Sequence, residues 1–180
     1  NPFTWNWMAL FNNPAQEQSA SNNNITPAIS STKLSNTEMC KKHAQLVADS
    51  AGSANSLFYS VQSYHYSNLD SVCYFELHYQ MDISYQGNKY TSQVYNLEAE
   101  SMSEMKLFPD IGLSFQEASC SVPETNYYGV TTNCKYYGLV FETKNNFTYV
   151  SNIYSPLGNK TAPPMSYSDY QALLQKRMNN

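Results

Sequence analysis

Cys40 and His43 are the residues that most resemble a nucleophile with its base. A helix expected to begin near Ser35 would place Cys40 close to its N-terminus, where the helix dipole lowers the pKa of a thiol, with His43 one turn along. Cysteine–histidine catalysis normally draws its base from elsewhere in the fold, and an even cysteine count explains Cys40 more simply as half of a disulfide. We therefore predict no catalytic residue.

A metal site could be drawn from Glu76, His78 and Asp82. Their spacing of two and four residues would place all three side chains on one face of a β-strand. Folding would have to supply a further ligand, such as His43 or His65, and an exposed strand commonly carries such residues. We predict no metal and no cofactor, because motifs such as GxGxxG and HExxH are also missing. An enzyme that uses either Cys40 with His43 or Glu76 with His78 is the last of the alternatives.

Tyrosine is abundant, with 16 residues in a chain of 180. Four of these tyrosines flank the segment between Cys120 and Cys134: Tyr127, Tyr128, Tyr136 and Tyr137. Flat rings beside Asn and Thr side chains suit the faces of sugars, although tyrosine is also an ordinary strand former. A glycan- or small-ligand-binding surface on these tyrosines is therefore an alternative function.

The strongest structural signal is a strand from Cys73 to Tyr85, in which apolar and polar residues alternate. Period two over this length predicts a half-buried strand. The Gly-Asn pair that follows suits a two-residue hairpin turn, so that Met81 would face Val94 and a return strand would run from about Tyr90.

Further elements are predicted on either side of this hairpin. Ser35 and Glu38 have the spacing of a capping box, and the helix that they begin should end or break near Gly52. The following stretch, 57–66, fits both periodicities and is interpreted as a helix. Beyond the hairpin, a third strand is expected through 111–115, then a second hairpin with its turn at 144–146.

These elements predict an α+β fold with an antiparallel, mainly meander-connected sheet of about five strands. The N-terminal helix should pack on one face, and a short C-terminal helix, capped by Ser168 and Gln171, should be peripheral. Two disulfides should staple the fold. Of three possible connectivities we favour the two that close local units, each contributing about 2–4 kcal/mol: Cys40 with Cys73, and Cys120 with Cys134.

Composition limits the classes of partner. The net charge is −4 and Arg177 is the single arginine, so no basic row could neutralise successive phosphates, and nucleic acid is not expected. No apolar run reaches 18 residues, which leaves membrane contact only to a segment outside this chain. Paired cysteines favour an extracytoplasmic location: secreted, periplasmic, cell surface or virion surface. Sequons at Asn24, Asn146 and Asn159 are no more than chance would produce.

The N-terminal residues 1–11 form an aromatic cluster that contains both tryptophans. Its candidate docking residues are Phe3, Trp5, Trp7, Leu10 and Phe11. Residues 12–35 have the polar composition of a flexible linker, and 36–180 should form one domain. The cluster packs on the chain's own core, docks on a protein partner or a second copy, or sits at a bilayer surface beside a membrane segment outside this chain. We favour docking, and predict a non-catalytic structural or interaction module, a subunit of a cell-envelope, cell-surface or virion assembly.

Overall fold

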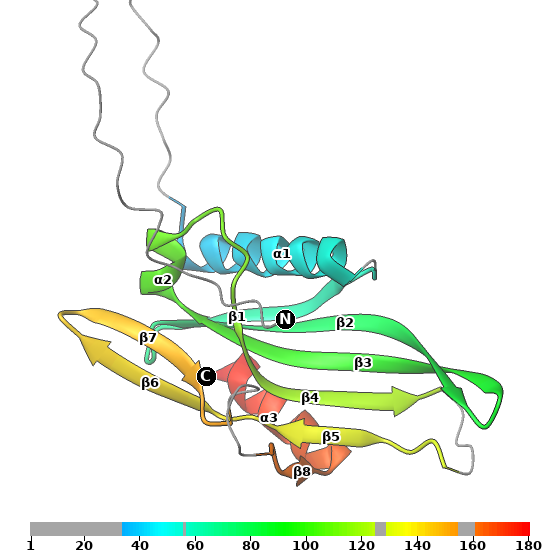
Figure 1. Cartoon of the computed structure of the whole chain (residues 1–180). Coiled ribbons are helices and arrows are strands. Elements are labelled where there is room, and N and C mark those ends of the chain that lie inside the picture. Colours follow the sequence, from blue (N-terminus) through cyan, green and yellow to red (C-terminus); the bar gives the residue numbers. More distant parts are fainter. Residues whose placement is uncertain (1–33, 56, 125–128, 155–160) are drawn as a thin grey trace, which may run out of the picture. The chain divides into compact units, whose positions relative to one another are not determined.

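The computed structural model describes residues 34–55, 57–124, 129–154 and 161–180. The predicted arm, 1–11, and nearly all of the predicted linker, 12–35, therefore lie outside the described residues. The predicted α+β class is confirmed, because an N-terminal helix, an antiparallel sheet and a short C-terminal helix are all present (Figure 1). The elements in chain order are α1 (Asn36–Asn55), β1 (Ser60–Ser67), β2 (Val72–Tyr85), β3 (Asn88–Ser101), α2 (Met102–Leu107), β4 (Phe115–Pro123), β5 (Asn133–Tyr136), β6 (Leu139–Lys144), β7 (Phe147–Asn152), β8 (Pro164–Met165) and α3 (Tyr167–Asn179).

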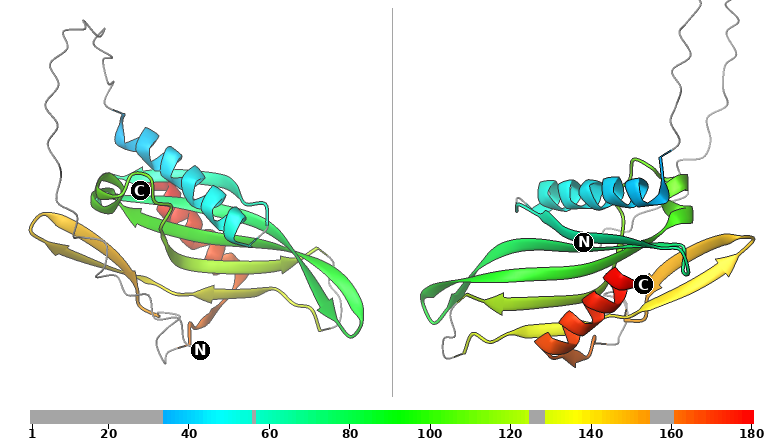
Figure 2. Two further views of the ribbon diagram at one scale, coloured as in Figure 1. Left: turned by 45° about the horizontal axis from the view of Figure 1, so that its top comes forward. Right: turned by 180° about the vertical axis from the view of Figure 1, so that it is seen from behind.

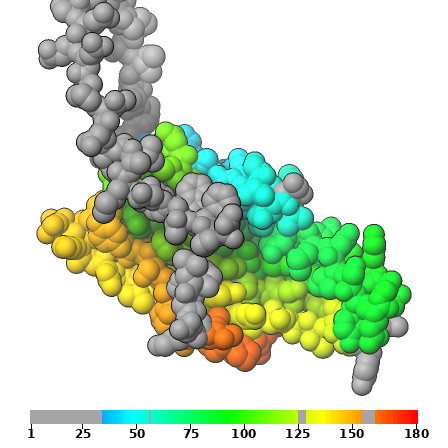
Figure 3. Space-filling model, in the orientation of Figure 1, coloured from blue at the N-terminus to red at the C-terminus, as the bar shows by residue number. Residues whose placement is uncertain are grey.

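The main sheet has six antiparallel strands in the order β1-β2-β3-β4-β5-β8, and β6 pairs with β7 in a separate hairpin. One face of the main sheet is covered by α1 and α2. The opposite face is covered by α3 and by the β6–β7 hairpin (Figure 2). In Figure 3, the turn between β2 and β3 (green) and the β6–β7 hairpin (yellow) lie at opposite ends of the coloured part of the molecule. The centre of the sheet is thus an inner layer.

This layering corrects the prediction of a half-buried β2. Residues from Val72 to Leu77 are buried on both faces, and alternation begins only beyond them. Phe75 packs beneath α1, whereas Tyr74 lies in the core on the other side. The polar face of β2 is covered and the last helix is not peripheral, because Tyr170 of α3 is fully buried against this face.

The β2–β3 turn lies one residue earlier than predicted. Tyr85 pairs with Asn88, so the two central residues are Gln86 and Gly87, which have φ values of 49° and 80°. Met81 consequently faces Ser92 and not Val94. The shift in pairing is two residues, and because side chains alternate with period two it leaves every side chain on its predicted face.

Three other local predictions were wrong. Residues 60–67 form strand β1 and not a helix, because they complete the hydrogen bonding of β2 across an antiparallel ladder. Ile111 and Leu113 precede β4, which begins at Phe115. The last helix is capped by Ser166, whose Oγ accepts a hydrogen bond from the Asp169 backbone N–H, and not by Ser168 with Gln171.

The predicted start of α1 and the predicted turn of the second hairpin are confirmed. The Ser35 Oγ accepts from the Glu38 backbone N–H at 3.2 Å, and the Glu38 carboxylate accepts from the Ser35 backbone N–H at 2.8 Å. Together these bonds form a reciprocal capping box. At the second hairpin, Asn145 and Asn146 adopt positive φ values of 55° and 62°, which asparagine tolerates.

Both predicted disulfides are present, and they account for all four cysteines. Cys40–Cys73 links α1 to β2, and Cys120–Cys134 joins directly paired residues of β4 and β5. Two disulfides indicate an oxidising, extracytoplasmic environment. Among the described helices, none is both long and apolar enough to cross a membrane.

A buried ion pair fixes α3 to the sheet. The Glu117 carboxylate is fully buried where the β3–β4 ladder is irregular, and it accepts two hydrogen bonds from Arg177 Nε, at 3.0 and 3.2 Å, and one from Nη2 at 2.6 Å. The guanidinium also lies 4.8 Å from the centre of the Tyr74 ring. Arg177 therefore satisfies a carboxylate that would otherwise be buried without a partner.

We expect Arg177→Ala to lower the free energy of unfolding by about 3 kcal/mol, because it leaves the Glu117 carboxylate buried and unpaired. Urea unfolding followed by circular dichroism measures this change. The matched control is Lys176→Ala, which removes a neighbouring exposed charge and should alter stability by less than about 0.5 kcal/mol. Equal effects of the two substitutions would contradict the role assigned to Arg177.

Candidate functional site

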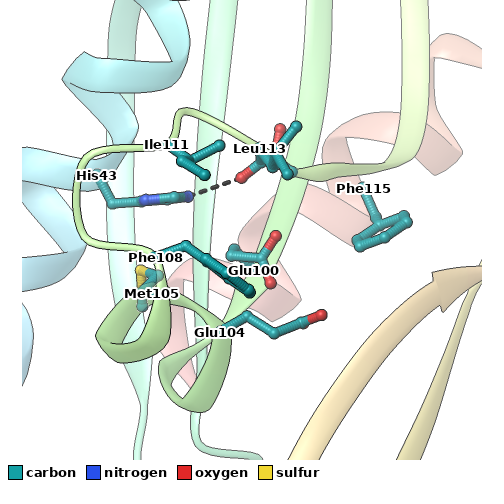
Figure 4. A pocket seen from close by; sticks show the side chains of 9 residues that line it. His43, Glu100, Glu104, Met105, Phe108, Ile111, Leu113 and Phe115 are labelled. Carbon is teal, nitrogen blue, oxygen red and sulfur yellow. Dashed lines mark hydrogen bonds between the residues drawn. The ribbon is translucent and has the colours of Figure 1, made fainter. Parts of the chain in front are cut away.

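A pocket of about 210 Å³ lies between α1, α2, the loop of residues 108–114 and the covered face of β3 (Figure 4). Apolar side chains make up most of its wall, and three titratable side chains join them. The lining residues are His43, Glu100, Glu104, Met105, Phe108, Ile111, Leu113, Ser114 and Phe115. A concave apolar pocket with a few convergent polar groups is the usual form of a binding site.

The register of β3 places two carboxyl groups on the face beneath α1. Glu98 pairs with Phe75 and Glu100 pairs with Cys73, so both glutamates share the face that carries the apolar core. Their exposed fractions are 8% and 3%. Carboxyl groups are rarely buried to this extent unless they are paired.

Glu100 lies against the Glu104 carboxyl, with which it shares a hydrogen bond. Its Oε1 accepts a hydrogen bond of 2.8 Å from the backbone N–H of Ser101. The neighbouring Glu104 carboxylate, on the first turn of α2, accepts from Ser101 Oγ at 2.9 Å and from the backbone N–H of Val150 at 3.3 Å. Burial, together with the adjacent Glu104 carboxyl, raises the pKa of Glu100 to about 9.

Glu98 lies next to this pocket, on the wall of a second cavity of about 450 Å³. Its Oε2 accepts a hydrogen bond of 3.0 Å from Ser114 Oγ. Burial raises the pKa of Glu98 to about 7 despite this bond. The second cavity also carries aromatic and amide groups, namely Tyr59, Tyr137, Asn96, Gln116 and Asn152.

His43 fixes the loop that separates the two cavities. Its Nε2 lies 2.8 Å from the Leu113 carbonyl oxygen, so this nitrogen donates to the loop backbone. Burial lowers the pKa of His43, which keeps the ring neutral at pH 7. Close packing fixes the same loop at Gly112, where a Cβ atom would lie only 2.7 Å from the Leu46 carbonyl oxygen. The pocket lining therefore carries carboxyl groups but no cation at neutral pH.

In the structure, the residues of the catalytic and metal-binding alternatives make contacts with other partners. Cys40 is bonded to Cys73 and has no thiol, although His43, three residues along, lines the pocket. Glu76 accepts a hydrogen bond of 3.0 Å from the Tyr170 hydroxyl. His78 bonds to Gln93 on the neighbouring strand, and Asp82 accepts from the Thr91 hydroxyl. Within the described ranges, no three His, Cys, Asp or Glu side chains are grouped so that they could hold a metal ion.

The four candidate tyrosines do not form one described surface. Tyr127 and Tyr128 lie outside the described residues, as do Phe3, Trp5, Trp7, Leu10 and Phe11 of the predicted arm. Tyr136 packs in the core cluster beneath α3, whereas the adjacent Tyr137 lines the 450 Å³ cavity on the α1 side. Tyr137 is thus the one of the two described tyrosines that borders a cavity.

Glu98 and Glu100 were not predicted as site residues, although the sequence contains a signal for them. Both occupy alternate positions of the return strand, and the predicted hairpin places them opposite the apolar face of β2. Acidic residues that face a core are exceptions to the burial pattern and mark a candidate site.

The comparisons with known proteins give no further assignment. No protein family model, no curated protein sequence and no solved structure matches this chain. The function is therefore argued from the contacts of its own residues.

Stability should fall as the pH rises, because Glu98 and Glu100 both have pKa values in the folded state above their ordinary value of 4.5. Between pH 4.5 and about 7, the Glu98 carboxyl holds its proton more firmly in the folded state than in the unfolded state. The same holds for Glu100 between pH 4.5 and about 9. Each titrating carboxyl then costs up to about 1.4 kcal/mol per pH unit. Urea unfolding at pH 5 and pH 8 measures the slope.

Glu100→Gln supplies the specific control for this pH dependence. The neutral amide should make the protein more stable than wild type at pH 8, and should flatten the slope between pH 5 and pH 8. Glu142→Gln, on an exposed strand of the hairpin, should retain the wild-type slope. A wild-type protein more stable at pH 8 than at pH 5 would contradict the buried, protonated state of these carboxyls.

Proposed function

We propose that this chain is a non-catalytic interaction module that belongs to an extracytoplasmic assembly, at the cell envelope, the cell surface or a virion surface. The two disulfides support export to an oxidising environment. Three contacts support a non-catalytic role: Cys40 is oxidised, His43 is bonded to a backbone carbonyl, and Glu76 is bonded to Tyr170.

The observation that carries the proposal is a group of exposed apolar side chains around the pocket. We call this group the rim, and it consists of Leu107, Phe108, Ile111 and Leu113, which are 57%, 45%, 44% and 54% exposed. Single exposed apolar residues are ordinary, but a group gathered around a pocket is typical of a contact surface. Phe108, Ile111 and Leu113 also line the pocket, so rim and pocket form one surface.

The aromatic segment 1–11 is the second contact in this proposal. Its composition indicates a docking role, because both tryptophans and two phenylalanines precede a polar stretch. Such a segment could anchor the module in a neighbouring subunit while the rim binds elsewhere on the same assembly. The two contacts can be tested separately, since they lie far apart in the sequence.

The rim is tested with the double variant Phe108→Ser and Ile111→Ser. We expect it to weaken the complex isolated under gentle, non-reducing conditions at least tenfold, with thermal stability close to wild type because both side chains are exposed. Native mass spectrometry measures the stoichiometry. Phe58→Ser is the matched control, since Phe58 is 86% exposed and lies outside the rim. An undiminished complex in the rim variant would exclude the rim as the contact.

Deletion of residues 1–13 tests the anchor in the same measurement. Loss of the complex with an unchanged thermal midpoint is the expected result. A large fall in the midpoint would instead mean that the segment packs on the chain's own core, and would refute its role as an anchor.

A small-ligand-binding domain, with glycans as one possible ligand, is the second candidate function. The observation that favours it is the 450 Å³ cavity, in which Tyr59 and Tyr137 lie beside three side-chain amides. Saturation-transfer NMR with a panel of monosaccharides should then show contacts that Tyr137→Ala abolishes. Tyr149→Ala, on the exposed face of the hairpin, should have no effect. No transfer to any sugar at millimolar concentration would exclude glycans.

A further inference from the structure

We propose that the 210 Å³ pocket receives a lysine side chain from a partner protein, with the ammonium group at Glu100 and the apolar flanks of that lysine on the rim. The inference rests on the proposed interaction function and specifies the chemistry of the partner at its point of contact.

The pocket is lined by the acidic residues Glu100 and Glu104, and no described lysine or arginine pairs with them. In the described part of the chain, the one ion pair is Arg177–Glu117, which lies on the opposite face of the sheet. No lysine or arginine there pairs with Glu98, Glu100 or Glu104. Glu100 is 3% exposed and lines the pocket; it accepts a hydrogen bond from the backbone N–H of Ser101 and shares a second hydrogen bond with the Glu104 carboxyl. A buried carboxyl in this state is stabilised by a cation that enters from outside.

The size and lining of the pocket suit a lysine side chain. A cavity of about 150 Å³ holds a molecule such as benzene, so 210 Å³ accommodates four methylene groups and an ammonium group. Met105, Leu113 and Phe115 supply apolar walls for the methylene stem. Lysine commonly buries its stem along such surfaces while its charge reaches a polar group.

The number of hydrogen-bond donors distinguishes lysine from arginine. A guanidinium carries five N–H donors and an ammonium group carries three. Apolar side chains make up most of the pocket wall, so few acceptors lie near Glu100 and Glu104. An ammonium group therefore leaves fewer buried donors without a partner than a guanidinium would.

The rim indicates a partner protein and not a free amine. Phe108, Ile111 and Leu113 of the rim line the pocket and remain about half exposed, and a small amine inside the pocket would leave much of that surface in water. A partner segment with apolar residues beside its lysine would cover the rim as well as fill the pocket. The apolar area would then supply binding energy in addition to the charge pair.

Binding should release a proton from Glu100 to solvent. The groups that face Glu100 are Glu104 from α2, His43 from α1 and Glu98 on β3 itself. The entering ammonium group favours the ionised carboxylate, whereas Glu104 disfavours it in the free protein. Affinity for the lysine should therefore rise as the pH increases towards 9, where less work is needed to ionise Glu100.

The test uses the full chain and acetyl-leucyl-lysyl-leucine amide, titrated by NMR and calorimetry at pH 6.5 and pH 8.5. We expect at least fivefold tighter binding at the higher pH, and at least tenfold weaker binding of the analogue with norleucine in place of lysine. Glu100→Gln should remove the preference for lysine over norleucine, whereas Glu142→Gln should retain it. Glu100→Gln is suited to the test, because it is expected to stabilise the fold.

The remaining arms identify the source of the cation. Equal binding of lysine and norleucine peptides would overturn the acidic contact, and tighter binding of the arginine peptide would overturn the choice of lysine. Equal affinity for free pentylamine would overturn the partner segment in favour of a small amine. If the rim variant loses the native complex but the lysine peptide does not bind, this inference alone fails. If the rim variant keeps the complex, the interaction function through the rim fails.

Discussion

Burial of the central strands on both faces is the constraint on which the rest of this structure depends. Because α1 covers one face of β2 and β3 and α3 covers the other, polar side chains on either face of these strands lose water. A buried polar group must find a partner or remain uncharged. The pairing of Tyr170 with Glu76 and of Arg177 with Glu117 meets this requirement beneath α3.

The face beneath α1 meets the same constraint in a different way. Glu98 and Glu100 lie there without a cation among the described residues, and burial raises the pKa of each carboxyl. Both groups are thus kept closer to neutral, which reduces the cost of burial. The two faces therefore differ in kind: one is completed by an internal ion pair, whereas the other holds acidic groups beside open space and an exposed apolar rim. This difference favours the α1 side as the surface of the proposed interaction.

Much of the fold could be predicted because its signals are local. The capping box at Ser35 and the alternation of β2 depend on short-range spacing, and the Cys120–Cys134 disulfide joins residues only 14 apart in the sequence. The failures arose where a distant element decides the outcome. Residues 60–67 became a strand because β2 offered a free edge, and Glu76 became buried because α3 returned to the sheet. The pocket combines α1, β3, α2 and a loop, so single-strand patterns did not reveal it.

The Cys40–Cys73 bridge has a mechanical consequence for the pocket. It joins α1 to β2 three residues before His43. Because Cys73 pairs with Glu100 on the neighbouring strand, the wall that carries His43 is covalently linked to the sheet beside Glu100. The loop contacts that same wall through Gly112 and Leu113. At its other end, the backbone N–H of Phe108 donates to the Glu104 carbonyl of α2, and that of Ile111 donates to the Phe108 carbonyl. The α1 side of the pocket is therefore fixed by a covalent bond, whereas the side that bears Phe108 and Ile111 is held through backbone hydrogen bonds.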